Sequence, residues 1–182
     1  MTAADWCRVV VIGVGNEFRR DDGIGPEVLS RLRERADAEG GGTVRFVCSD
    51  GEPASLIEAW TGASLALVID AVMADPPSPG RLHRFVIGRD EASGARVVSS
   101  HGLGVGAAIG LADALGRMPD RLVVHAVEAG DVGYGVGLTP AVSAAADALT
   151  GAVLRDVQAA MVGRCCAASA DESVGQTGRD LA

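Results

Sequence analysis

Two short runs of this sequence, residues 8–13 and 64–70, consist almost entirely of apolar residues, several of them β-branched. Runs without alternation between apolar and polar positions are typical of strands that are buried on both faces of a sheet. Such a sheet needs helices above and below it. The first expectation is therefore an α/β fold.

The segments between these runs predict the remaining elements. Apolar residues recur every fourth position over residues 24–36, which indicates an amphipathic helix that ends at a run of three glycines. Thr139 and Pro140 suit the N-cap and the first position of a last helix, which we expect to end near Met161. The other expected elements are strands over 43–49, 81–87 and 122–127 and helices over 53–60 and 103–115.

Strands that alternate with helices predict a three-layer α/β sandwich around a twisted, mostly parallel five-stranded sheet. The chain has 182 residues, about one domain, and shows no internal repeat or linker. We therefore predict a single domain over residues 1–162. Residues 163–182 are small and polar without periodicity, and we expect a disordered tail there. In such sheets ligands bind at the carboxyl ends of the strands.

The composition of the chain argues against several classes of function. The formal net charge is −8, and no block of Lys and Arg stands out, which disfavours sequence-independent binding of nucleic acid. No apolar run reaches the ~18 residues of a membrane span. The first residues also lack the pattern of a signal peptide. We therefore expect a cytoplasmic protein that binds neither nucleic acid nor a membrane.

The loop after the first strand, residues 13–25, carries two adjacent acids. A Gly-x-Gly pair opens this loop as in a dinucleotide-binding fingerprint, but Phe18 stands where the third glycine would be. The acids would also repel a pyrophosphate at the helix N-terminus. For Asp21 we expect a helix-capping role. Asp22 is a candidate site residue.

Two further candidates are expected at the same edge of the sheet. Asp70 ends the third strand, where a charged group must be solvated, paired or liganded. His101 lies in a loop before a helix. Two carboxylates and one imidazole suit an open site for nickel, zinc or manganese. His83 and His125 lie within expected strands without an evident acidic neighbour, so we interpret them as structural.

Four ordered motifs resemble those of the endopeptidases that mature nickel–iron hydrogenases. They are Gly-x-Gly-Asn with Asp-Asp and Gly-x-Gly over 13–25, the strand-ending Asp70, Ser-Ser-His-Gly-Leu-Gly over 99–104, and Gly-Leu-Thr-Pro over 137–140. The similarity covers about residues 8–162. It departs at residues 50–53, which read Asp-Gly-Glu-Pro where many members have an Asp-Gly-Gly-Thr-like turn linked to substrate choice.

This resemblance implies a phosphorylase/hydrolase-like α/β sandwich. It also implies a reaction: removal of a C-terminal peptide from the large-subunit precursor of a nickel–iron hydrogenase, after nickel has been inserted. By position, the family's metal ligands fall on Asp22, Asp70 and His101. The nickel of the precursor would act as the recognition element, and another divalent metal in the free enzyme is the alternative.

Several mechanisms and functions stay open at this point. Asp22, Asp70 and His101 would converge on the precursor's nickel or on an ion beside it, and an acid would orient the attacking water. Alternatively, Asp22 and Asp70 form an aspartic-type pair with divided acid and base roles. The chain contains no Gly-x-Ser-x-Gly elbow of a serine hydrolase. A non-catalytic hydrogenase assembly factor and a nucleotide-binding domain are the competing functions.

Overall fold

The computed structural model describes residues 9–39, 44–88 and 104–171 of the chain. The strands are β1 (Val9–Val14), β2 (Val44–Ser49), β3 (Leu65–Val72), β4 (Leu82–Gly88) and β5 (Arg121–Glu128). The helices are η1, a short 3-10 helix (Arg20–Gly23), α1 (Ile24–Glu39), α2 (Pro53–Trp60), α3 (Val105–Ala114) and α4 (Pro140–Asp171). The predicted elements occur in the predicted order, with boundaries within two residues except at the end of α4.

The strands form one sheet in the order β2-β1-β3-β5-β4, and its mostly parallel character is confirmed. Neighbouring strands are parallel from β2 through β5, whereas β4 runs antiparallel to β5. A parallel neighbour requires a crossover connection, usually a helix. Only a proline-containing loop joins β3 to β4, so β4 enters the sheet in the opposite direction.

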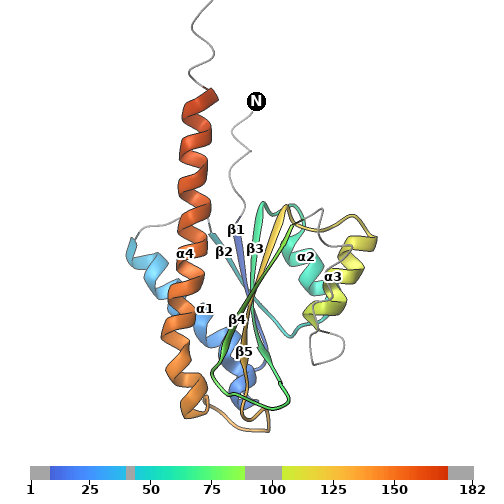
Figure 1. Ribbon diagram of the computed structural model, residues 1–182, viewed down its shortest axis with the longest axis vertical. Helices are drawn as coiled ribbons and strands as arrows, with labels where there is room; N and C mark the ends of the chain where they lie inside the picture. Colours follow the sequence, from blue (N-terminus) through green and yellow to red (C-terminus); the bar gives the residue numbers. More distant parts are fainter. Residues whose placement is uncertain (1–8, 40–43, 89–103, 172–182) are drawn as a thin grey trace, which may run out of the picture.

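Helices cover both faces of the sheet, which confirms the three-layer α/β class. Helices α1 and α4 lie on one face, and α2 and α3 lie on the other (Figure 1). Alternate residues of β1 contribute to the two cores. Val10 and Ile12 belong to the core beneath α2 and α3, whereas Val9 and Val11 belong to the opposite core. This two-sided burial explains why the strand sequences are apolar without alternation.

Helix α4 is longer than we expected. It continues to Asp171, ten residues past the expected end at Met161, and it extends beyond the sheet (Figure 1). The expected tail of residues 163–182 therefore begins inside this helix, and residues 172–182 lie outside the described part. We placed the end of this helix where the apolar periodicity stops. Apolar periodicity shows which helix face packs against the core, and a helix can continue without it. The loss of that pattern after Met161 therefore does not exclude a helix, and no proline interrupts residues 162–171.

None of the helices in the described part of the chain combines the length and the apolar character needed to cross a membrane.

Candidate active site

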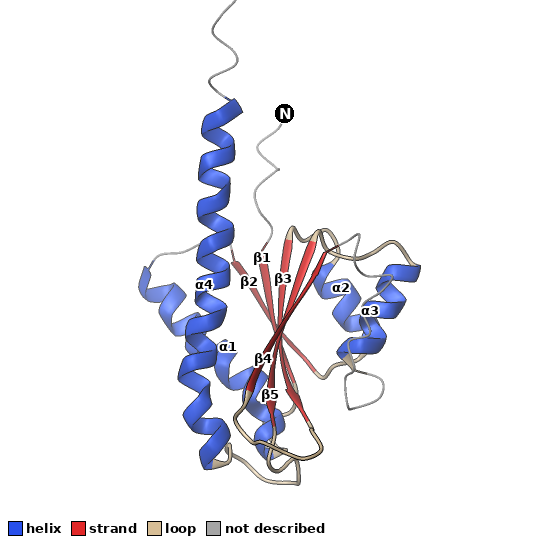
Figure 2. Ribbon diagram, viewed as in Figure 1, coloured by secondary structure: helices blue, strands red, loops and turns tan. Residues whose placement is uncertain are grey.

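The carboxyl ends of the parallel strands meet at one edge of the sheet, where the loops after β1, β3 and β5 gather (Figure 2). Close packing of α1 brings the first loop to this edge. A Cβ atom on Gly25 would overlap the backbone of Val14 in β1 and lie 2.9 Å from the carbonyl oxygen of Ile69 in β3. The start of α1 therefore lies directly against the ends of β1 and β3.

Asp22 lies in η1 at this edge and is partly exposed. Its Oδ2 accepts a hydrogen bond from the backbone N–H of Asn16 at 3.0 Å. The loop can return this closely because Gly15 adopts a φ of +127°, and a Cβ there would overlap the carbonyl oxygen of Asp22. The glycine and asparagine of the first motif thus hold the Asp22 carboxylate at the strand ends.

Asp70 lies within electrostatic reach of Asp22, and its titration is strongly perturbed. Its side chain is partly buried near the end of β3. Burial raises the pKa of Asp70 to about 7, a hydrogen bond from the backbone N–H of Ala71 opposes the rise, and the nearby Asp22 charge adds to it. A carboxyl group with this pKa can give or take a proton near neutral pH.

Asp21 is structural, but not as the helix cap that we expected. Its side chain is fully buried, and its oxygens accept hydrogen bonds from Gly130 N (2.8 Å), Asp131 N (3.1 Å), Thr139 N (2.6 Å) and Thr139 Oγ1 (2.9 Å). Burial alone would raise the pKa of Asp21, but these hydrogen bonds outweigh it and lower the pKa. Asp21 therefore fastens the loop after β5 to the loop that carries Asp22.

His101, the third predicted site residue, lies outside the described residues. Within the described ranges, no group of three or more His, Cys, Asp or Glu side chains is arranged to hold a metal ion. The structure thus brings Asp22 and Asp70 together. The participation of His101 and the binding of a metal stay predictions.

The interpretation of His83 and His125 as histidines without acidic neighbours is wrong. His125 Nε2 lies 2.8 Å from Asp156 Oδ2 of α4, and His83 Nε2 lies 2.7 Å from Glu128 Oε1 of β5. Both carboxylates are distant in sequence, so only the fold reveals them. Burial lowers the pKa of His125, although its bond to Asp156 opposes the shift.

The His83–Glu128 pair shares a sheet face with Asp70. In the strand register, Asp70 is opposite Ala126, and Ala126 is opposite His83. Side chains at paired positions point to the same face, so Asp70 and His83 flank Ala126 at a separation of about 10 Å between Cα atoms, two strand spacings. Sequence reasoning missed this pair. The signal that could have indicated it is the period-two pattern of β4. This pattern places His83 on the same sheet face as the buried Ile87.

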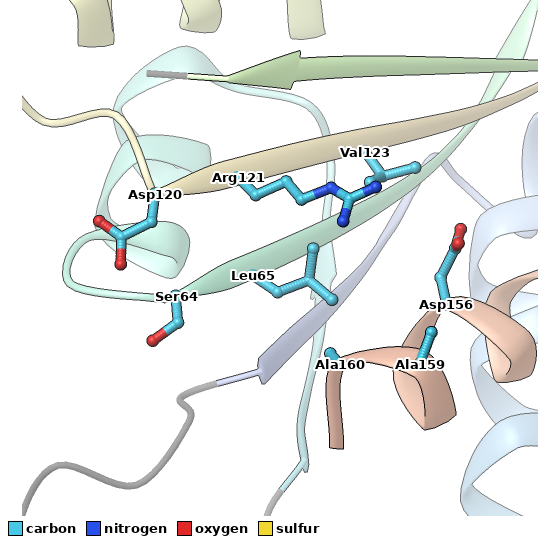
Figure 3. A pocket seen from close by; sticks show the side chains of 8 residues that line it. All are labelled: Ser64, Leu65, Asp120, Arg121, Val123, Asp156, Ala159 and Ala160. Carbon is cyan, nitrogen blue, oxygen red and sulfur yellow. The ribbon is translucent and has the colours of Figure 1, made fainter. Parts of the chain in front are cut away.

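A cavity of about 310 Å³ lies at the opposite edge of the sheet, where β3 and β5 begin (Figure 3). It is lined by Ser64, Leu65, Asp120, Arg121, Val123, Asp156, Ala159 and Ala160. Asp156 is already engaged by Arg84 and His125. Because the cavity lies where β3 and β5 begin, it does not include the predicted site, which lies at the carboxyl ends of these strands.

A protein-family model described as hydrogenase maturation protease matches residues 26–156, more than half of the chain. This range includes Asp70 and His101, whereas Asp22 lies just before it. No curated protein sequence matches the chain.

Several solved structures are similar to this one, including the following three. The hydrogenase maturating endopeptidase HybD from Escherichia coli has a TM-score of 0.67 and 20% identity, covering 83% of this chain and 92% of that chain. The solution structure of an endopeptidase from Escherichia coli has a TM-score of 0.66 and 21% identity, covering 81% and 90%. HybD from Thermococcus kodakarensis has a TM-score of 0.62 and 22% identity, covering 81% and 97%. At these identities the likeness concerns the fold.

Proposed function

The chain belongs to the hydrogenase maturation protease family and is a peptide hydrolase, and from this premise we propose its reaction. It removes a C-terminal peptide from the nickel-loaded large-subunit precursor of a nickel–iron hydrogenase. The observation that carries the proposal is the pair formed by Asp22 and Asp70, two adjacent carboxylates at the carboxyl ends of the strands. Burial raises the pKa of Asp70 to about 7, and the charge of Asp22 adds to the rise.

The pair supports divided acid and base roles. The charged carboxylate of Asp22, oriented by Asn16 N–H, accepts a proton from the attacking water. The oxygen of that water bonds to the scissile carbonyl carbon. Asp70, protonated near neutral pH, donates its proton to the leaving amine as the C–N bond breaks. The proton on Asp22 then returns to Asp70, which leaves both groups ready for another cycle.

Nickel enters this proposal as part of the substrate. As the alternative to the acid–base pair, Asp22, Asp70 and His101 hold the nickel of the precursor, because oxygen and imidazole ligands suit divalent nickel. Asp70 is then ionised and is not the proton donor: burial and the charge of Asp22 make this form costly in the free protein, and a divalent cation would offset both effects. When bound, such a cation supplies Lewis-acid stabilisation of the scissile carbonyl oxygen.

The test is the intact mass of a nickel-loaded large-subunit precursor before and after incubation with this protein. We expect loss of a C-terminal peptide with the wild type, no loss with Asp22→Asn, and no loss from nickel-free precursor. Asp113→Asn, a change at an exposed position of α3, is the matched control and should cleave normally. A precursor that binds but keeps its mass would instead indicate an assembly factor.

A further inference from the structure

Three exposed apolar side chains border the edge that carries Asp22. Tyr134 is 94% exposed, Val136 is 77% exposed and Phe18 is 61% exposed. We call these three residues the apolar rim. Single exposed apolar residues are ordinary, but a group on adjoining loops is a feature of interaction sites.

The backbone beneath the apolar rim is fixed by hydrogen bonds. Gly135 N–H donates to the carbonyl oxygen of Phe18, and Arg20 N–H donates to the carbonyl oxygen of Gly135, both at 2.9 Å. This is a short parallel pairing of Arg19 with Gly135. It places Phe18 and Tyr134 at neighbouring positions. A fixed backbone loses little conformational entropy when a partner binds.

The apolar rim and the candidate active site share one hydrogen-bonded unit. Phe18 precedes Asp22 by four residues in the same loop, and Asp22 N–H donates to the carbonyl oxygen of Arg19 at 3.1 Å. The buried carboxylate of Asp21 holds the other loop through Gly130, Asp131 and Thr139. A polypeptide substrate whose scissile bond lies over Asp22 must therefore pass close to the rim.

Two arginines balance the two acids nearest the apolar rim, whereas Asp22 carries the charge of the candidate site. Arg20 Nε lies 3.1 Å from Asp131 Oδ2, and Glu17 and Arg19 have opposite charges in the same loop. The whole chain, in contrast, has a formal net charge of −8. An apolar area whose flanking acids are balanced by arginines is suited to an apolar partner surface, and its two aromatic side chains would contribute much of the binding energy.

We propose that the apolar rim docks an apolar segment of the large-subunit precursor next to the bond that is cleaved. This inference rests on the proposed function, since it takes the precursor as the partner. The rim supplies binding, whereas Asp22 and Asp70 supply the chemistry. Its removal should therefore weaken association and leave the chemical step intact.

The experiment combines Phe18→Ser, Tyr134→Ser and Val136→Ser in one protein. Leu115→Ser is the matched control, because Leu115 is 56% exposed but follows α3, away from the rim. Binding of purified nickel-loaded precursor and the KM and kcat of cleavage are measured for each protein. We expect the triple variant to raise Kd and KM about 10- to 100-fold, with kcat within about twofold of the wild type. The control should match the wild type.

The outcomes separate this inference from the proposed function. Unchanged Kd and KM in the triple variant, with its thermal unfolding unchanged, would overturn the docking inference and leave the proteolytic function standing. If the wild type binds the precursor but does not cleave it, a weakened triple variant still supports the rim. A wild type that does not bind the precursor overturns the docking inference. A triple variant whose only change is weaker self-association in analytical ultracentrifugation also overturns the docking inference, because the apolar rim would then be an interface between copies of this chain.

Discussion

Replacing Asp70 with Asn should stabilise the metal-free protein above neutral pH while abolishing cleavage. The ionised carboxylate of Asp70 is costly because it is partly buried and lies near the charge of Asp22. An amide keeps nearly the same shape, and its oxygen can still accept the hydrogen bond from Ala71 N–H. It has no charge to bury, so the cost disappears.

The magnitude follows from the pKa of Asp70. The pKa rises from 3.8 to about 7, and each unit corresponds to about 1.36 kcal/mol, so the upper limit is about 4 kcal/mol. The side chain keeps some contact with water, which reduces the cost, and we expect about 2 kcal/mol. In a chain of this size, that corresponds to a rise in Tm of about 4–8 °C.

The sign of the pH dependence is specific. An acid whose folded pKa is raised imposes no penalty below its unfolded pKa near 4. The penalty grows between about pH 4 and 7 and is complete above the folded pKa. The advantage of Asp70→Asn should therefore be full at pH 8.5, fall to about a quarter of that at pH 4.5 and vanish below about pH 4.

Calorimetric unfolding in the presence of a chelator, at pH 4.5, 6.5 and 8.5, measures this difference. Asp113→Asn at an exposed site should show no gap at any pH. A Tm for Asp70→Asn at or below the wild type at pH 8.5 would refute the reasoning. A gap that does not change with pH would refute it as well.

Other substitutions test the framework of the site. Asp21→Asn places an amide among N–H donors and should cost about 2–4 kcal/mol in urea unfolding at pH 7, and the deficit should shrink as the pH falls below 3.8, because a lowered folded pKa stabilises the protein fully only above the unfolded value. Glu128→Gln should also be less stable at pH 7. Its wild-type pKa is lowered, first by the imidazole bound to it, so the deficit should shrink in thermal scans as the pH falls toward 4. Gly15→Ala should cost about 3 kcal/mol or more and abolish cleavage, because its Cβ would displace the backbone of Asp22. Gly116→Ala, also at positive φ but in open space, should cost only about 1 kcal/mol and cleave normally in the mass assay.

Much of the fold could be predicted from the sequence because its strand signals are strong and local. The apolar run that became β3 and the proline that starts α2 both lie where the pattern placed them. The direction of β4 was not predictable in the same way. It depends on a helix-free connection and on pairing with β5, a strand more than thirty residues further along the chain. The end of α4 was misplaced because a helix can continue after its apolar periodicity stops, and no proline interrupts residues 162–171.

The candidate site was predictable to a different degree at each position. The prediction that Asp22 and Asp70 meet followed from one topological rule, that parallel strands bring their carboxyl ends to one edge. The partners of His83 and His125 could not be found, since each carboxylate lies at least thirty residues away in sequence. Pairing at that separation is visible only once the register of β4 and the position of α4 are known.

The two adjacent acids of the first loop show why sequence alone could not divide their roles. Asp21 and Asp22 are the same residue type one position apart, yet η1 turns their side chains to different surroundings. Asp21 points to backbone N–H groups that a carboxylate satisfies well, and its pKa falls. Asp22 instead retains partial exposure next to a second acid whose pKa it raises. The buried acid fixes the loop, and that fixed loop holds the other acid near Asp70, where its charge adds to the effect of burial on the Asp70 pKa.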